Sequence, residues 1–90
     1  MSDTKHHFQR VRWHSRRGLL ELDIVLVPFA DQYFQLLPEH EQDAYVKLLN
    51  CEDQDLLSWW LQTAIPVDDD ICHILTVIRE RHGSASSSPH

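Results

Sequence analysis

The sequence predicts an all-α protein, a compact bundle of about five helices in a single domain. Apolar residues recur at intervals of three and four along several segments, which is the period of one face of an α-helix. Pro38, Pro66 and short polar runs separate these segments. The one run that could form a buried strand, residues 22–27, has no partner strand elsewhere in the chain. A lone strand would leave its backbone groups without hydrogen bonds, so we interpret this run as helical.

The size of the chain is that of one domain with one modest core, since it has 90 residues. No apolar run approaches the ~20 residues that a membrane-spanning helix needs. The N-terminal segment also lacks the apolar centre of a signal peptide. We therefore expect a cytoplasmic protein without membrane insertion. We expect the helical domain to cover residues 1–83, followed by a flexible Ser-rich tail over residues 84–90.

The first two predicted helices differ in their apolar content. The first runs from about His6 to Ser15 and has few apolar residues, so it should pack through a narrow stripe. The second, near residues 19–36, is the longest apolar segment and is predicted to be the core helix. Pro28 lies inside it and removes a hydrogen bond to the carbonyl of Ile24, which predicts a bend.

The third and fourth predicted helices follow from start and stop signals. Pro38 is expected in the first turn of the third helix, where a missing N–H is no loss, and Asn50 at its C-cap. Asp53 is expected as the N-cap of the fourth helix, which Pro66 should end. The residues at helical spacing that should be buried are Ala44, Tyr45, Leu48 and Leu49 in the third helix, and Leu56, Leu57, Trp60, Leu61 and Ala64 in the fourth.

The fifth predicted helix has the clearest signals. The acidic run at residues 68–70 lies at its start, where negative charge is favourable, and Gly83 is in the position of a helix stop. Its buried face should consist of Ile71, Ile74, Leu75 and Ile78.

The distribution of charge bears on the class of partner. Residues 1–17 carry five basic residues against one acidic residue, whereas residues 18–78 carry twelve acidic residues against one lysine. An acidic chain is a poor nucleic-acid binder, so we expect no nucleic-acid partner, and the uneven charge suits a protein partner. One alternative stays open, in which the basic first helix serves a small helical nucleic-acid-binding or regulatory protein-interaction module.

Signatures of catalysis and of metal binding are missing from the sequence. It has no Gly-rich phosphate loop, no nucleophile elbow and no H-E-x-x-H motif. Cys51 and Cys72 form no C-x-x-C pair, and His6, His7 and His14 do not have the i, i+4 spacing of a helical metal pair. We therefore expect free thiols, no metal site and no enzymatic activity. We also expect a monomer, since no large apolar stripe is left over.

The sequence changes character at Arg16-Arg17-Gly18-Leu19-Leu20-Glu21, where the basic segment meets the acidic one. One interpretation makes Gly18 a helix N-cap, with Glu21 reaching back to the cap N–H. The other is that Gly18 lets a partner's backbone come close, which a Cβ would prevent, with Arg17 and Glu21 flanking the contact. The spacing alone leaves both interpretations open.

Arg17-Gly18-x-x-Glu21 matches the Arg-Gly-x-x-Glu signature of the succinate dehydrogenase FAD assembly factor family, and the chain resembles this family over roughly residues 8–82. Trp13 upstream, Pro28-Phe29 downstream and the acidic turn at residues 51–56 leading to Trp59 belong to the same resemblance. Members of this family are small all-helical proteins that promote covalent attachment of FAD to a flavoprotein.

The resemblance implies a chaperone-like assembly factor that binds the succinate dehydrogenase flavoprotein subunit and promotes its flavinylation. The fumarate reductase flavoprotein subunit is a further partner that the resemblance allows. The chain would bind no cofactor stably itself, because the FAD on which it acts is held by the flavoprotein. The residues expected on the partner-binding surface are Arg16, Arg17, Gly18, Glu21, Trp13, Asp23 and Trp59.

Overall fold

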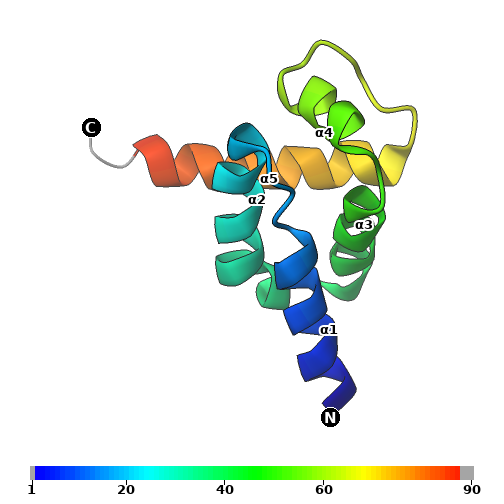
Figure 1. Ribbon diagram of the computed structural model, residues 1–90, viewed down its shortest axis with the longest axis vertical. Coiled ribbons are helices and arrows are strands. Elements are labelled where there is room, and N and C mark those ends of the chain that lie inside the picture. The colour runs from blue at the N-terminus through cyan, green and yellow to red at the C-terminus, as the bar shows by residue number, and fades with distance from the viewer. Residues whose placement is uncertain (1, 88–90) are drawn as a thin grey trace.

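The computed structural model confirms the all-α prediction. It describes residues 2–87, and their side chains from residue 8 to residue 82. Within this part of the chain Figure 1 shows α1, α2 and α3 running roughly along the vertical of the view, with α5 crossing them and α4 above α3. None of the described helices is long and apolar enough to cross a membrane. The elements are α1 (Ser2–His14), α2 (Leu20–Tyr33), the 3-10 helix η1 (Phe34–Leu36), α3 (Glu39–Leu49), α4 (Asp53–Trp60) and α5 (Asp69–Ser87).

The centre of the core is Tyr45 on α3, whose side chain is completely buried. Its ring lies against Phe29 and Phe34, with centroid distances of 5.3 and 5.6 Å. Its hydroxyl lies 2.7 Å from the hydroxyl of Ser15 and donates to the carbonyl of Leu26 at 3.2 Å. These polar groups are fully enclosed, so their hydrogen bonds offset the loss of water around them. One tyrosine thus ties the end of α1 to α2 and α3.

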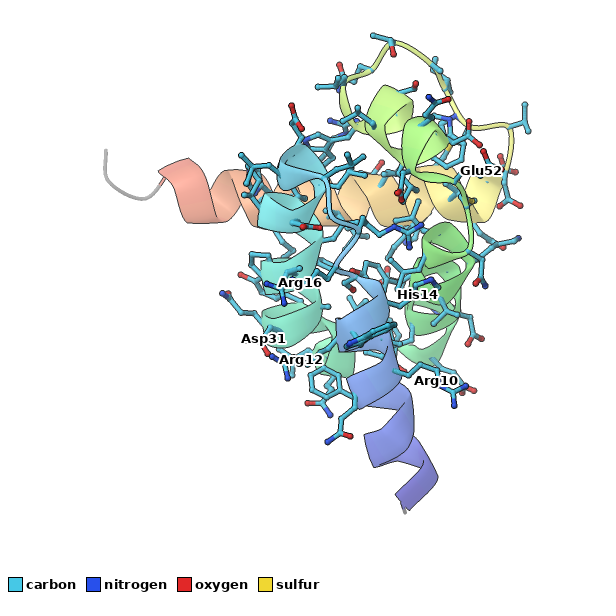
Figure 2. The ribbon with its side chains drawn as sticks, viewed as in Figure 1. Arg10, Arg12, His14, Arg16, Asp31 and Glu52 are labelled. Atoms are coloured by element: carbon cyan, nitrogen blue, oxygen red, sulfur yellow. The ribbon has the colours of Figure 1, made fainter. Side chains whose placement is uncertain are left out.

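The predicted buried faces of α3 and α5 are confirmed, because every residue named for them has less than one tenth of its surface exposed. These eight residues form one cluster with apolar residues of α2, which is consistent with its predicted place as the core helix. On the outer side of this helix Arg12 of α1 pairs with Asp31 of α2, Nε to Oδ1 at 3.0 Å (Figure 2). Both partners of this pair are about half exposed, so it contributes little to stability.

The bounds of the first two helices differ from the prediction. α1 begins at Ser2, four residues earlier than expected, and ends one residue before Ser15. α2 includes Pro28 but ends at Tyr33, because the chain tightens into η1 before Leu37. The predicted bend at the proline stays a prediction.

α4 is shorter than predicted, and its capping residue is different. Glu52 holds the N-cap position, and Asp53 is the first helical residue. The helix ends at Trp60, and Gln62 adopts a left-handed backbone with φ of 64°. Leu61 and Ala64 are therefore exposed, although their spacing predicted burial. The apolar spacing continues past the point where the backbone leaves the helix. For this reason the predicted burial of Leu61 and Ala64 and the predicted helix stop at Pro66 are both wrong.

The remaining bounds correct two further expectations. Pro38 holds the N-cap position of α3 in an extended conformation, one residue before the first turn, and Asn50 is the C-cap as predicted. α5 continues through Gly83 to Ser87, so the predicted stop is wrong and residues 84–87 belong to the helix, while the flexibility of the tail stays a prediction. A single glycine costs a helix only about 1 kcal/mol, which is too little to end it. Residues 88–90 lie outside the described part of the chain.

Candidate functional site

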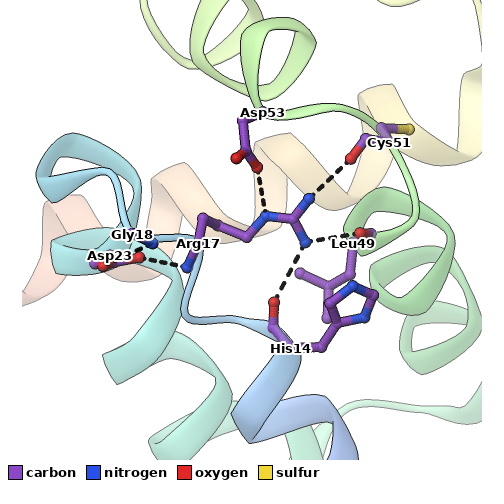
Figure 3. A network of polar contacts seen from close by, with 7 residues as sticks. All are labelled: His14, Arg17, Gly18, Asp23, Leu49, Cys51 and Asp53. Atoms are coloured by element: carbon purple, nitrogen blue, oxygen red, sulfur yellow. Dashed lines mark hydrogen bonds and ion pairs between the residues drawn. The ribbon is translucent and has the colours of Figure 1, made fainter.

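The guanidinium of Arg17 is the most highly connected polar group at the predicted site. Its Nε donates to Asp53 Oδ1 at 2.7 Å, and its two terminal nitrogens donate to the carbonyls of Leu49 and Cys51 at 2.8 and 2.9 Å (Figure 3). A longer bond of 3.3 Å reaches the carbonyl of His14. The side chain is only 10% exposed, so it lies inside the molecule.

This arrangement matches the local electrostatics of two helix ends. Leu49 ends α3, and its carbonyl belongs to the negative end of the helix dipole, which favours a cation. Asp53 begins α4, where a carboxylate is favourable. The planar guanidinium satisfies both carbonyls and the carboxylate at once, which a lysine could not do. Arg17 therefore joins the turn between α1 and α2 to the turn between α3 and α4.

The backbone of the same turn is held by Asp23 in the first turn of α2. Its Oδ1 accepts the N–H of Arg17 at 2.7 Å, and its Oδ2 accepts the N–H of Gly18 at 3.3 Å. A carboxylate here is also favourable against the positive end of α2. The group that reaches back from the helix is thus Asp23, two residues later than the predicted Glu21.

Gly18 itself is exposed and has φ of +88°, a conformation that favours glycine. It does not cap α2, because the N-cap is Leu19, so the capping interpretation of this glycine is wrong. Apart from Gly18 and its two chain neighbours, a Cβ built on Gly18 would have no atom of the described chain within 4 Å. The intramolecular reason for the glycine is therefore its backbone angle, and the space beside it is open for a partner.

Glu21 and Arg16 are exposed on either side of this turn. Among the described residues Glu21 forms no hydrogen bond or ion pair, and the N-cap of α2 has no side-chain capping bond. The predicted capping role of Glu21 is therefore wrong. Both charged groups are available for contacts outside the chain.

Trp13 has 81% of its surface exposed, which is unusual for the largest apolar side chain. It borders a depression of about 440 Å³ together with Gln9, Arg12, Arg16 and Val27. The depression lies between the outer surfaces of α1 and α2, next to the Arg17–Gly18 turn. An exposed tryptophan flanked by arginines has the composition of a protein-binding surface.

Trp59, the last predicted site residue, is half-buried and packs against the core, as does Trp60. The carbonyl of Trp59 accepts a hydrogen bond of 2.6 Å from Arg79 of α5. The guanidinium of Arg79 also lies 4.7 Å from the ring centroid of Trp60. The structure thus brings Arg17, Gly18 and Asp23 together, and its described contacts link Trp59 to α5.

Sequence reasoning did not predict that Asp53 and the carbonyls of Leu49 and Cys51 accept hydrogen bonds from Arg17 at this site. Asp53 was expected only to cap α4, because spacing within one segment does not show which carboxylate an arginine 36 residues away will meet. The signal that could have pointed to Asp53 was the acidic turn at residues 51–56, which belongs to the same family resemblance as the Arg17-Gly18 pair.

The fold and the site define a small helical binding protein, in which the Arg17 side chain, which is only 10% exposed, braces a turn whose Gly18 is exposed. Comparison with known proteins gives this class a family. The sequence profile described as "Flavinator of succinate dehydrogenase" matches residues 9–82. The chain belongs to this family.

Curated relatives cover most of the chain. It is 42% identical over 72 residues to the FAD assembly factor SdhE of Pseudomonas putida, a match that covers 80% of this chain and 86% of the relative. It is 44% identical over 73 residues to the protein of the same name in Pseudomonas aeruginosa, with 81% and 87% covered. It is 36% identical over 72 residues to that of Shewanella oneidensis, with 80% and 88% covered.

Proposed function

We propose that this protein is a FAD assembly factor, which binds the flavoprotein subunit of succinate dehydrogenase and promotes covalent attachment of FAD to it. The observation that carries this proposal is the Arg17–Gly18 turn. Its backbone is fixed by Asp23 and its arginine by Asp53, while the outer side of Gly18 is open. Membership in the flavinator family supports the same function.

Six of the seven predicted site residues divide into two groups under this proposal. Arg17 and Asp23 position the turn, because their side chains are engaged within the chain. Arg16, Gly18, Glu21 and Trp13 contact the flavoprotein, because they are exposed. Trp59 is half-buried, and a partner contact through its ring stays a prediction.

The proposed mechanism is preorganisation of the partner. The flavoprotein holds both FAD and the side chain that becomes attached to it. By binding best to the flavoprotein conformation in which these groups are close and aligned, the assembly factor raises the population of that conformation. Correct orientation of bound groups can lower a barrier by several kcal/mol. The chain therefore needs no catalytic group and no bound cofactor of its own, and it acts as a chaperone rather than as an enzyme.

We extend the proposal to a monomeric protein in the cytoplasm, and to the fumarate reductase flavoprotein as a second partner. The nucleic-acid alternative is less well supported. Of the basic side chains of the first segment, Arg17 lies inside and Arg12 is paired with Asp31. The patch that could attract phosphates is correspondingly small.

The test is covalent flavin fluorescence of the succinate dehydrogenase flavoprotein subunit in a denaturing gel. A host that lacks the gene is complemented with wild type, Gly18→Arg or Glu21→Ala. We expect wild type to restore fluorescence and Gly18→Arg to fail. Glu80→Ala, an exposed carboxylate on α5, is the matched control for Glu21→Ala and should flavinylate normally. Flavinylation that does not depend on the gene would overturn the proposal.

A further inference from the structure

Three side chains that are good ligands for divalent metals meet where α3 packs on α5. His40 and Glu41 lie at the start of α3, and His73 lies in the first half of α5. One ligand atom of each residue lies within 4.8 Å of the other two. His73 Nε2 is 2.7 Å from Glu41 Oε2, and the imidazole centroids of His40 and His73 are 6.2 Å apart. The packing of two helices therefore assembles a cluster that is dispersed in the sequence.

We propose that His40, Glu41 and His73 form a binding site for a divalent transition-metal ion, and that zinc is the ion that fits best. Two imidazoles and one carboxylate are a ligand set that zinc accepts, with bonds of about 2.0–2.2 Å. Neighbouring ligand atoms of a tetrahedral ion are then about 3.3 Å apart. The close Glu41–His73 pair must open by roughly half an ångström, and His40 must approach it.

These movements need only side-chain rotation. His40 and His73 are exposed, with 53% of the His73 side chain accessible, so their rings can turn without disturbing the core. The Glu41 carboxylate is 16% exposed and already oriented toward His73 by their hydrogen bond. The backbone positions of all three residues are fixed by regular helix. Preorganisation of this kind lowers the entropic cost of collecting the ligands.

The surroundings favour a cation. His40 borders a shallow depression of about 400 Å³ whose wall includes the acidic residues Asp43 and Asp70. Lys47 also lines it, but its ammonium group pairs with Asp68 at 2.8 Å and with Asp70 at 3.3 Å. Three protein ligands leave a fourth coordination position for water or for a small anionic ligand. A metal with an open position beside this depression can bind such a ligand.

This site is separate from the Arg17–Gly18 turn. Arg17 contacts the end of α3 at Leu49, whereas the histidine cluster is at the start of the same helix. The inference therefore does not depend on the proposed function. A bound ion would join α3 to α5 and would stabilise the folded chain, because it binds the folded state in preference to the unfolded one.

The test is titration of the full chain with zinc. Calorimetry measures the zinc affinity, and the melting temperature measures how much zinc stabilises the folded chain. Cobalt(II) serves as a second probe, because its visible absorption reports the coordination geometry. The decisive variants are His40→Gln, Glu41→Gln and His73→Gln. The glutamine amide at position 73 can still donate to Glu41, so the helix contact is kept while a metal ligand is lost. We expect each variant to lose at least about tenfold in zinc affinity, together with the zinc-dependent rise in melting temperature.

The controls address three of the other histidines of the chain, His6, His7 and His14. His14→Gln replaces an exposed histidine on α1 and should leave zinc binding unchanged. A double replacement of His6 and His7 by Gln removes the adjacent pair near the N-terminus and should also leave it unchanged. The proposal is overturned if the three cluster variants bind zinc as tightly as wild type, or if binding is lost on replacing His6 and His7. Circular dichroism without metal verifies that each variant is folded.

Discussion

Arg17 and Asp53 form an ion pair, with Nε 2.7 Å from Oδ1, although 36 residues separate them in the sequence (Figure 3). The pair joins the turn before α2 to the first residue of α4. The same guanidinium also holds the carbonyls of Leu49 and Cys51. The arginine of the Arg-Gly-x-x-Glu motif is therefore an internal brace, and the exposed parts of the motif depend on it for their position.

Arg17→Ala should lower the free energy of unfolding by about 3 kcal/mol, because charge-assisted hydrogen bonds are lost and buried acceptors are left unpaired. Arg17→Lys should lower the free energy of unfolding by about half as much, since an ammonium group cannot reach all three acceptors. Urea denaturation measures both values. Arg16→Ala is the matched control: its side chain is exposed, and the change should stay within about 0.5 kcal/mol. Wild-type stability in Arg17→Lys would contradict the bracing role.

Gly18→Ala should cost about 1–2 kcal/mol of stability, because φ of +88° is unfavourable for a residue with a Cβ. Gly18→Asn should cost less, since asparagine adopts positive φ more readily, but it places more atoms on the outer surface. Comparing urea midpoints with flavinylation separates the two effects. Gly18→Asn should be more stable than Gly18→Ala. If close approach of the flavoprotein matters, Gly18→Asn should also be less active in flavinylation than Gly18→Ala. An active Gly18→Asn would show that only the backbone angle is needed.

Elements with regular spacing were predictable from the sequence. The buried faces of α3 and α5 follow from apolar residues three and four apart, because all eight residues named for them pack into the core. The same reasoning failed at α4, where apolar spacing continues through Leu61 and Ala64 after the backbone has left the helix. Periodicity measures which residues could share a face, and it does not measure where the backbone turns away.

The candidate site was predictable only in part. Arg17, Gly18 and Asp23 are near one another in the sequence, and the structure brings them together in one turn. That Arg17 points inward depends on Asp53 and on the carbonyls of Leu49 and Cys51, which local patterns cannot reveal. The His40 and His73 pair was missed for a similar reason, because only the packing of α3 on α5 brings the two rings together.

The buried Tyr45 should make stability sensitive to high pH. Burial raises the pKa of the Tyr45 hydroxyl above its ordinary value, although the hydrogen bond with Ser15 opposes this. The unfolded chain therefore loses this proton first, at a pH near 10, and stability should fall as pH rises further. The decline contributed by one such group is at most about 1.4 kcal/mol per pH unit. Urea denaturation between pH 8 and about 11 measures it.

Tyr45→Phe isolates this effect. It should lose about 1 kcal/mol at neutral pH, since its hydrogen bonds with Ser15 and Leu26 disappear, but its stability should decline less steeply in alkali. Lys47 needs a separate control, because its hydrogen bond with Asp68 raises the pKa of its ammonium group and produces a decline of the same sign. In Lys47→Gln the steep decline due to Tyr45 should persist. Equal slopes in wild type and Tyr45→Phe would rule out the tyrosine as the cause.

Trp13 is expected to serve binding rather than folding. Its side chain is 81% exposed, so Trp13→Ala should change the free energy of unfolding by less than about 0.5 kcal/mol. If the ring is an anchor for the flavoprotein, the same change should weaken binding at least tenfold, about 1.4 kcal/mol, because tryptophans dominate the energy of many interfaces. Leu36→Ala removes another large side chain, 76% exposed, from η1 and should leave binding unchanged. Equal affinities of wild type and Trp13→Ala for the purified flavoprotein would place the contact surface elsewhere than on the outer side of α1.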